Sequence, residues 1–576
     1  MSKLVTVYID NQPYQVEEGQ NLLQIALANQ IDIPHLCYHP DLHADHNCRL
    51  CLVKHDGEVE TSCEIQAREG LRIETKDAEI QALRTENLKL ILASHRTNCP
   101  KCRAQLPCKV AGLMKKYGVT SEEYRRKMLD LAVHKMANAA EFDPNLCVRC
   151  GLCISACAEI GINFLRLEGK SSDTHLAHSQ NPKVDCIYCG QCTVSCPVGA
   201  IREQSHLEAV EEVLADSDKI VIVQMAPSVR ASIGEEFGLE PGLNLEKKMF
   251  TALRILGFAK IFDVNMGADI TTMVEAEELV ERLRQKFTGK KPSLPMFTSC
   301  CPGWVKFLEF YYPELIPHLT TARSPHIHSG GAYKTWWAKK AGVDPSKIVV
   351  VSLMPCTSKK YEASMDKLTF EFAGHKLKPV DLVLTTREIA ALLKKHQLDL
   401  PNLPDSEADL EGEYSGAAAI YGASGGVMES ALRTSAYLLT GQDLPKIDLQ
   451  EVRGMKGIKK ATIKMGEQEI KVAVVATPRN ARNILEKIKR GVEEYDYIEF
   501  MACPGGCIGG GGQPLQGTVE TIKKRIAGLY TIDAQKKVRR AHENSIVQEF
   551  LAFVKSEPAL SKKILHTSYS AKNKGA

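Results

Sequence analysis

Two runs of cysteines constrain the fold of this chain more than any other feature of its sequence. Each run has the spacing Cys-x-x-Cys-x-x-Cys-x-x-x-Cys, and the second run starts 39 residues after the first. Four thiolates are the ligand set of one 4Fe-4S cubane, so the repeat predicts a small domain folded around two cubanes. The candidate ligands are Cys147, Cys150, Cys153 and Cys157 in the first run, and Cys186, Cys189, Cys192 and Cys196 in the second.

The repeat resembles the cysteine pattern of bacterial two-cluster ferredoxins. In those proteins the last cysteine of each run binds the cluster of the other run. The resemblance implies that Cys196 completes the first ligand set and that Cys157 completes the second. Pro197 follows the second run as it does in these ferredoxins, whereas Ala158 follows the first, a departure that leaves the ligands intact.

The chain has 20 cysteines, and the expected compartment decides how they are interpreted. Its first residues, MSKLVTVYIDNQPYQ, contain no apolar signal segment and no twin arginine, and no apolar run reaches 18 residues. We therefore expect a cytoplasmic protein without a membrane partner, in which thiols stay reduced and bind metals rather than form disulfides. Lys plus Arg (73) nearly balance Asp plus Glu (70), which gives no indication of nucleic-acid binding. The length of 576 residues predicts several domains.

A further group of four cysteines lies near the N-terminus, where Cys48 and Cys51 form a Cys-x-x-Cys core between Cys37 and Cys63. Two strand-like segments and an amphipathic helix precede it and predict a small β-rich domain. The group suits a 2Fe-2S cluster; the alternative is a zinc ribbon, although zinc ribbons prefer two Cys-x-x-Cys knuckles. A resemblance to plant-type ferredoxins, which have a β-grasp fold, favours the cluster, although the spacing here is looser.

One histidine and three cysteines follow in the sequence HRTNCPKCRAQLPC, namely His95, Cys99, Cys102 and Cys108. Such a set fits zinc, and it equally fits an iron-sulfur cluster with one imidazole ligand. The residues alone leave both alternatives open. The neighbouring cluster motifs favour a third 4Fe-4S cluster.

From residue 209 onward the cysteines become sparse and apolar strands alternate with helical segments. The strand-like segments KIVIVQMAPSV, KIVVVSLMPC and VAVVAT predict an α/β domain with parallel strands, whose functional residues lie at strand ends. The remaining cysteines fit that expectation, because they follow three separate strands. They are Cys300, Cys301, Cys356, Cys503 and Cys507.

The last two of these cysteines flank a glycine-rich loop, MACPGGCIGGGGQP, at 501–514. Glycines let the backbone approach a bulky group closely. A phosphate-binding loop is the alternative, but no Lys-Ser/Thr follows the glycines and the chain has no G-x-G-x-x-G. The loop is therefore expected to surround an inorganic cofactor.

Three motifs, TSCCPGW at 298–304, MPCTSKKYE at 354–362 and the glycine-rich loop, resemble in order and spacing the signature motifs of iron-only (FeFe) hydrogenases. The upstream cysteine groups resemble the accessory domains of long clostridial-type members, and catalytic subunits of NAD(P)-linked electron-bifurcating hydrogenases share this domain order. The resemblance implies a multidomain α+β and α/β chain. Its expected domains are a plant-type 2Fe-2S domain (1–78), a 4Fe-4S domain with one His and three Cys ligands (79–118), a two-cluster ferredoxin domain (138–208), an α/β H-cluster domain (209–515) and a small-subunit-like segment (516–576).

The resemblance also implies an active centre, the H-cluster, in which a 4Fe-4S cubane is joined through a cysteine to a diiron unit with CO, cyanide and azadithiolate. Protons are reduced there reversibly to dihydrogen. The implied cubane ligands are Cys301, Cys356, Cys503 and Cys507, with Cys507 as the bridge. The residues implied around the diiron unit are Lys359, Ser228, Pro227, Met354 and Met501. One 2Fe-2S cluster and three accessory 4Fe-4S clusters complete the expected cofactors.

Cys300 is the only cysteine without a metal in this assignment, and the resemblance implies that it donates protons. A thiol suits this role because its reference pKa of about 8.5 can be tuned by its surroundings. The family's proton relay maps onto Glu275, Thr320, Glu278 and Arg282. Without the resemblance, Glu278 and Arg282 would be interpreted as a surface ion pair at i, i+4.

Two departures from the family pattern accompany these matches: Thr320 stands where clostridial members have serine, and His326 where the family often has glutamine. The alternative function is that of a non-catalytic iron-sulfur assembly factor, which Cys300, Lys359 and the complete glycine-rich motif argue against. The expected redox partner is ferredoxin or flavodoxin. Reduction of NAD(P) would require flavin- or NAD(P)-binding partner subunits, because the chain has no nucleotide motif, and maturation proteins would supply the diiron unit.

Overall fold

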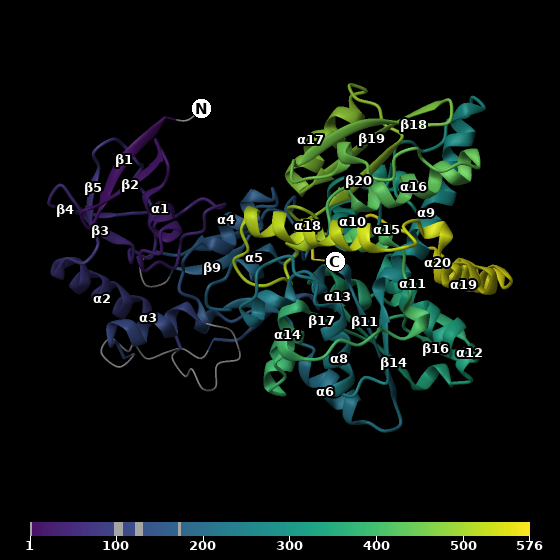
Figure 1. Cartoon of the computed structure of the whole chain (residues 1–576), viewed down its shortest axis with the longest axis horizontal. Helices are drawn as coiled ribbons and strands as arrows, with labels where there is room; N and C mark the ends of the chain where they lie inside the picture. Colours follow the sequence, from purple (N-terminus) through teal and green to yellow (C-terminus); the bar gives the residue numbers. More distant parts are fainter. Residues whose placement is uncertain (1–2, 97–107, 121–130, 171–173, 576) are drawn as a thin grey trace.

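The computed structural model describes residues 3–96, 108–120, 131–170 and 174–575 of the chain (Figure 1). Its N-terminal part is a five-stranded sheet in the order β2-β1-β5-β3-β4. Val5, Val7 and Ile9 alternate along β1 and point into the core of this domain. The β-rich domain predicted from the sequence is therefore present. Its elements are β1 (Leu4–Ile9), β2 (Gln12–Glu17), α1 (Leu22–Ala28), β3 (Leu52–His55), β4 (Glu58–Thr61) and β5 (Arg72–Glu74).

Two helices, α2 (Ala78–Leu92) and α3 (Lys109–Tyr117), follow this sheet. The side chain of Asp77 caps the first turn of α2 by accepting from the N–H groups of Glu79 and Ile80. Arg84, fully buried, donates to the carbonyl groups of Thr75 and Leu52. These bonds fasten α2 to the N-terminal sheet.

The region of the two cysteine runs forms a three-stranded sheet, a two-stranded hairpin and two short helices. Each helix starts directly after the second cysteine of its run, at Gly151 and Gly190, which both have positive φ. The two halves of the repeat therefore fold alike. The elements are β6 (His134–Met136), β7 (Ala140–Phe142), α4 (Leu152–Glu159), β8 (Leu165–Glu168), β9 (His175–His178), α5 (Gln191–Val194) and β10 (Ile201–Glu203).

The catalytic part of the chain contains two four-stranded sheets, which lie above and below helix α18 (Val519–Gln535, yellow) in Figure 1. The first sheet, in the order β12-β11-β14-β17, is entirely parallel and its central strands are buried, as their continuous apolar sequence predicts. Its strands are β11 (Ile220–Met225), β12 (Lys260–Asp263), β14 (Ile348–Met354) and β17 (Leu382–Thr385).

The second sheet has the order β13-β20-β19-β18. The prediction of parallel strands is correct for the first three, but β18 pairs antiparallel with β19 in a hairpin. Its outer position explains the alternating burial of β18, which has one solvent-facing side. The strands are β13 (Met296–Phe297), β18 (Ile458–Met465), β19 (Gln468–Ala476) and β20 (Tyr497–Met501).

Helices surround both sheets, and α9 packs against α11 and α16. The C-terminal tail after α20 crosses the catalytic part: Lys572 N donates to Glu309 O, and Lys574 Nζ reaches the carbonyl oxygens of Ser179 and Asn181 in the cysteine-run region. No helix in the described ranges is long and apolar enough to cross a membrane. The other elements are α6 (Leu207–Ala215), α7 (Pro227–Arg230), α8 (Glu246–Ile255), α9 (Val264–Phe287), α10 (Pro302–Tyr311), α11 (Pro325–Ala332), α12 (Ala338–Ala341), α13 (Ser358–Ala363), β15 (Phe370–Phe372), β16 (His375–Leu377), α14 (Thr386–Lys395), α15 (Gly416–Ala419), α16 (Gly426–Thr440), α17 (Pro478–Lys489), α19 (Ser545–Lys555) and α20 (Pro558–Leu565).

Candidate active site and cluster sites

A buried cavity lies where strands from both sheets end. β11 ends before α7, β14 ends before Cys356, and β20 ends before the glycine-rich loop. The carboxyl ends of parallel strands are where such domains place their functional residues. The predicted pocket residues that line the cavity are Pro227, Ser228, Cys300, Cys301, Met354, Cys356, Lys359, Met501 and Cys507.

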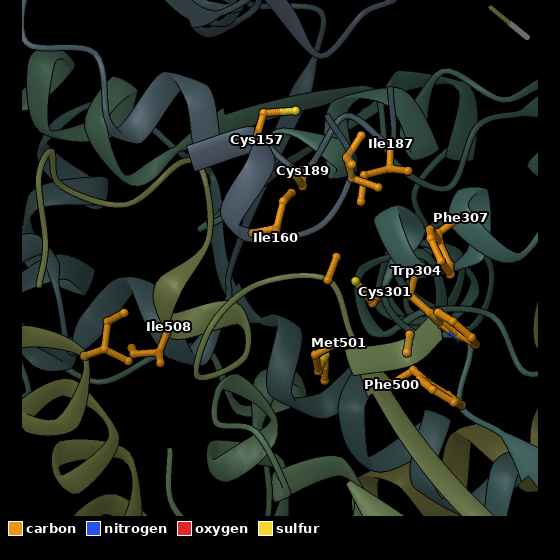
Figure 2. Close-up of a cluster of buried hydrophobic side chains, with 14 of the residues drawn as sticks. Cys157, Ile160, Ile187, Cys189, Cys301, Trp304, Phe307, Phe500, Met501 and Ile508 are labelled. Carbon is orange, nitrogen blue, oxygen red and sulfur yellow. The ribbon is translucent and has the colours of Figure 1, made fainter. Parts of the chain in front are cut away.

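Local packing fixes the position of Cys301. Cys301 precedes α10, so its thiol lies at a helix N-terminus, where a thiolate is favoured. Trp304, one turn into the helix, stacks on Phe500 of β20 with ring centroids 3.9 Å apart and donates to the carbonyl of Thr298. Figure 2 shows Cys301 beside this aromatic pair. The stack therefore joins the first and the third sequence motif.

Four thiols of the cavity region act on one another electrostatically. Burial raises the pKa of Cys503, and the charges of Cys356, Cys301 and Cys507 raise it further. Burial likewise raises the pKa of Cys356 to about 11, with Cys301 as the next contribution. Thiols that resist ionisation alone become thiolate ligands when a cationic metal group binds them. The donor set fits a 4Fe-4S cubane.

The other wall of the cavity presents donors suited to an anionic group. Ser228 Oγ is buried and has no hydrogen-bond partner among the described residues. Lys359 Nζ donates to the carbonyl of Cys300 (2.9 Å) and to Glu362 Oε2 (2.8 Å). Burial lowers the pKa of Lys359, but the carboxylate of Glu362 outweighs this effect and keeps it raised. An orphaned hydroxyl and a buried ammonium are what the cyanide ligands of a diiron unit require.

The glycine-rich loop packs backbone against backbone. A Cβ atom on Gly510 would lie 2.3 Å from the carbonyl oxygen of Pro355, and one on Gly511 would lie 2.4 Å from the Cα of Gly190. Only glycine fits at these two positions. The loop therefore touches the second cysteine run, a contact that the sequence did not reveal.

The eight cysteines of the two runs form two separate groups, each around its own cavity. The grouping is the crossed one that the ferredoxin resemblance implies. Figure 2 shows Cys157 and Cys189 of one group above Cys301 in a single buried cluster. The first cavity is lined by Cys147, Cys150, Cys153 and Cys196, and the second by Cys157, Cys186, Cys189 and Cys192.

The N-terminal cysteines form two close pairs. Cys37 Sγ lies 3.2 Å from Cys48 Sγ, and Cys51 Sγ lies 3.3 Å from Cys63 Sγ. All four are buried. His46 Nδ1, which the sequence reasoning did not single out, lies 3.1 Å from Cys63 Sγ. The four thiols are placed as one ligand group.

The His/Cys group is described only in part, because Cys99 and Cys102 lie outside the described residues. His95 is buried, and its Nδ1 bonds to the carbonyl of Leu146, next to Cys147. Burial lowers the pKa of His95, which favours the neutral imidazole that a metal ligand must be. Cys108 caps α3.

The predicted proton-relay residues lie between the cavity and α9. Glu275, fully buried on α9, contributes its charge after burial to the raised pKa of Cys300. Thr320 Oγ1 donates to Glu278 Oε2 (2.8 Å), and Arg282 Nη2 donates to Glu278 Oε1 (2.6 Å). The expected ion pair therefore exists, but its side chains are only 19% and 14% exposed. The structure brings all five residues together.

Comparison with known proteins decides the family. The model of the iron only hydrogenase large subunit, C-terminal domain, matches residues 219–511. This chain belongs to the iron-only hydrogenase family. Further models match 2–78 (2Fe-2S iron-sulfur cluster binding domain), 184–202 (4Fe-4S binding domain) and 519–572 (iron hydrogenase small subunit). The chain is thus a hydrogenase with 2Fe-2S and 4Fe-4S binding domains and the H-cluster fold.

Relatives of this hydrogenase cover nearly all of it. The chain is 38% identical to the NADP-reducing hydrogenase subunit HndD of Solidesulfovibrio fructosivorans, over 98% of this chain and 99% of that protein. It is also 38% identical to iron hydrogenase 1 of Clostridium pasteurianum, with the same coverage. A solved [FeFe]-hydrogenase HydA1 from Chlamydomonas reinhardtii is 37% identical, with a TM-score of 0.57 over 64% of this chain and 99% of that chain.

The hydrogenase site also contains residues to which the sequence reasoning gave no role. Glu362 Oε2 accepts from Lys359, from Ser324 (2.9 Å) and from His326 Nε2 (2.7 Å). Burial raises the pKa of Glu362, but Lys359 and His326 hold it at about 2. Burial and the charge of Lys359 lower the pKa of His326 to about 4, so this imidazole is neutral. Glu362 ends the motif MPCTSKKYE, which was the available signal.

Proposed function

We propose that this hydrogenase reversibly reduces protons to dihydrogen at the cavity between its two sheets, with electrons delivered through the accessory cluster sites. The observation that carries this proposal is the continuity of cysteine groups from the N-terminal domain to the cavity. Burial raises the pKa of a thiol in each group, and the charge of a neighbouring group raises it further. The pairs that connect the groups are Cys48 with Cys150, Cys192 with Cys153, and Cys503 with Cys189.

The cavity residues have separate roles in holding the H-cluster. When bound, the H-cluster supplies the electrons and the open iron position for proton reduction. Lys359 and Ser228 would donate hydrogen bonds to its cyanide ligands, and Pro227, Met354 and Met501 would exclude water. The cubane ligands would be Cys301, Cys356, Cys503 and Cys507, with Cys507 as the bridging thiolate.

Cys300 is proposed to donate protons into the cavity. Burial and the charge of Glu275 raise the pKa of Cys300 well above its usual range, so the group is a neutral thiol with a proton to give. Burial raises the pKa of Glu275 to about 8, so its protonated form is populated near neutral pH. Glu278, Thr320 and Arg282 would connect Glu275 with the surface.

The accessory cofactors would be one 2Fe-2S cluster on the four N-terminal cysteines and three 4Fe-4S clusters. Two of the latter would occupy the crossed cysteine groups. The third would be held by His95, Cys99, Cys102 and Cys108. A thiol with no ligand role beside the cavity, a buried ammonium and an orphaned serine hydroxyl all serve catalysis, which argues against a non-catalytic assembly factor.

Ferredoxin or flavodoxin is the proposed redox partner of the isolated chain. The second candidate is that the chain is the catalytic subunit of an NAD(P)-linked assembly, which the end-to-end similarity to HndD favours. In that case flavin- or NAD(P)-binding subunits would supply the nucleotide site, because the chain has no nucleotide motif. Maturation proteins would install the diiron unit in either case.

The test compares electron donors. The purified chain, loaded with its clusters, is expected to evolve dihydrogen from reduced ferredoxin or reduced viologen and not from NADH. Dihydrogen evolution from NADH by the isolated chain would refute the assignment of donors. Purification from the native cells, followed by flavin analysis of co-purifying subunits, separates the two candidates.

A further inference from the structure

The two carboxylate oxygens of Glu275 have different surroundings. Oε1 accepts a hydrogen bond from the hydroxyl of Tyr497 at 2.8 Å. Oε2 is buried and has no hydrogen-bond partner among the described residues. An orphaned carboxylate oxygen inside a protein is costly, and the cost is removed when that oxygen carries a proton or accepts one.

Tyr497 owes its position to the alternation of side chains along β20. Tyr497 contributes to an apolar cluster that includes Leu279 of α9 and Met428 of α16. Ile498 and Phe500 belong to the core on the opposite side of the strand. Tyr497 is fully buried, and its hydroxyl donates to Glu275 alone. A phenol among apolar side chains, with one donor aimed at one carboxylate, indicates a function beyond packing.

We propose that Tyr497 is a positioning residue for proton transfer, whose hydroxyl holds Oε1 of Glu275 and so leaves Oε2 as the oxygen that exchanges protons with Cys300. The proposal rests on the proposed function. It makes Tyr497 part of the relay without contact to the diiron site. It also assigns one defined oxygen to the transfer, so that the carboxyl group does not have to rotate between steps.

The charged and titratable groups around Glu275 set its proton affinity. Burial raises the pKa of Glu275 to about 8, and the carboxylates of Glu278 and Glu499 raise it as well. The hydroxyl of Tyr497 and the guanidinium of Arg282 act in the opposite direction. The remaining groups that face it, Cys300 and Tyr421, have pKa values well above their usual range and stay neutral. Loss of the Tyr497 hydroxyl therefore leaves the Glu275 carboxyl protonated up to a higher pH.

The variant Tyr497→Phe tests this in the full-length protein with its clusters. Infrared difference spectra across a pH titration follow the C=O stretch of the protonated carboxyl, and Glu275→Gln assigns the band by removing it. We expect the titration of Glu275 to move upward by about one pH unit or more, because a hydrogen bond to a charged acceptor stabilises it. The pH optimum of dihydrogen evolution should move the same way, with kcat lowered and KM for ferredoxin unchanged.

Tyr333→Phe is the matched control. Tyr333 is also fully buried, and its hydroxyl donates to the carbonyl of Asp263 at 3.0 Å, away from the relay. This variant should lose comparable stability and leave both the carboxyl titration and the pH optimum in place. Equal pH shifts in the two variants, or no shift in Tyr497→Phe, would overturn the proposal.

A second substitution keeps the test decisive if Tyr497→Phe does not fold. Incorporation of 3-fluorotyrosine at position 497 keeps the shape of the ring and makes its hydroxyl a stronger donor. The titration of Glu275 should then move to lower pH, opposite to the phenylalanine variant, and an unchanged titration would overturn the proposal. Because the carboxyl band is measured without turnover, a protein that titrates as expected but evolves no dihydrogen would refute the proposed function and not the placement of Glu275 by Tyr497.

Discussion

Glu362→Gln removes a buried charge while keeping the shape of the side chain. Glu362 Oε2 accepts three hydrogen bonds, from Lys359, His326 and Ser324. A hydrogen bond to an ionised acceptor is about 1 kcal/mol stronger than one to a neutral acceptor. Three such bonds amount to about 3 kcal/mol, which agrees with the cost of about 3 to 5 kcal/mol for breaking a buried ion pair. We expect the free energy of unfolding to fall by about this amount.

The matched control is Glu388→Gln. Glu388 pairs with the adjacent lysine, Lys360, at 2.9 Å, but this pair lies outside the cavity lining. Both variants should lower the urea midpoint measured by tryptophan fluorescence, which reports the catalytic part because all three tryptophans, Trp304, Trp336 and Trp337, lie there.

Only Glu362→Gln should also shift the cyanide infrared bands and reduce dihydrogen evolution, because only Lys359 faces the cavity. The reasoning is wrong if Glu362→Gln has wild-type bands and rate, or if Glu388→Gln changes them equally.

Three further expectations concern the cysteines and the relay. Cys300→Ala should retain iron content and the carbonyl and cyanide bands while turnover collapses, whereas Cys301→Ala should prevent assembly of a normal H-cluster. Cys196→Ser should remove the cluster of the first run and Cys157→Ser that of the second, as seen by electron paramagnetic resonance; loss of each cysteine's own cluster would contradict the crossed grouping. Because the pKa of Glu275 is raised to about 8, the folded state keeps a proton that the unfolded chain releases above about pH 4.3. The free energy of unfolding therefore falls as pH rises between these values, and Glu275→Gln should abolish that part of the slope in pH-dependent urea titrations.

The cysteine groups and the strand ends could be predicted from the sequence because their signals are local. The repeated spacing marks two cubane sites, and buried parallel strands read as continuous apolar segments that end at Cys356 or just before Cys503. The crossed grouping of Cys157 and Cys196 followed from a known family pattern. The antiparallel edge strand β18 was missed because its pairing depends on the hairpin with β19 and not on its own composition.

The contacts that tune the site could not be predicted, because they join segments that are distant in the sequence. Tyr497 and Glu275 are 222 positions apart, and alternation along β20 indicates the face of Tyr497 but not its partner. His326 and Glu362 are 36 apart on different helices. The approach of Gly511 to Gly190 likewise requires the tertiary structure, since a run of glycines indicates close packing without naming the neighbour.

Isotope exchange tests the central claim most directly, because it needs the cavity and the proton relay but no redox partner. The purified chain, with its carbonyl and cyanide bands confirmed by infrared spectroscopy, is incubated with dihydrogen in deuterated water, and mass spectrometry follows the gas phase. The account predicts continuous formation of HD and D₂, which Cys300→Ala reduces to background. A fully loaded wild-type protein that forms no HD would contradict it.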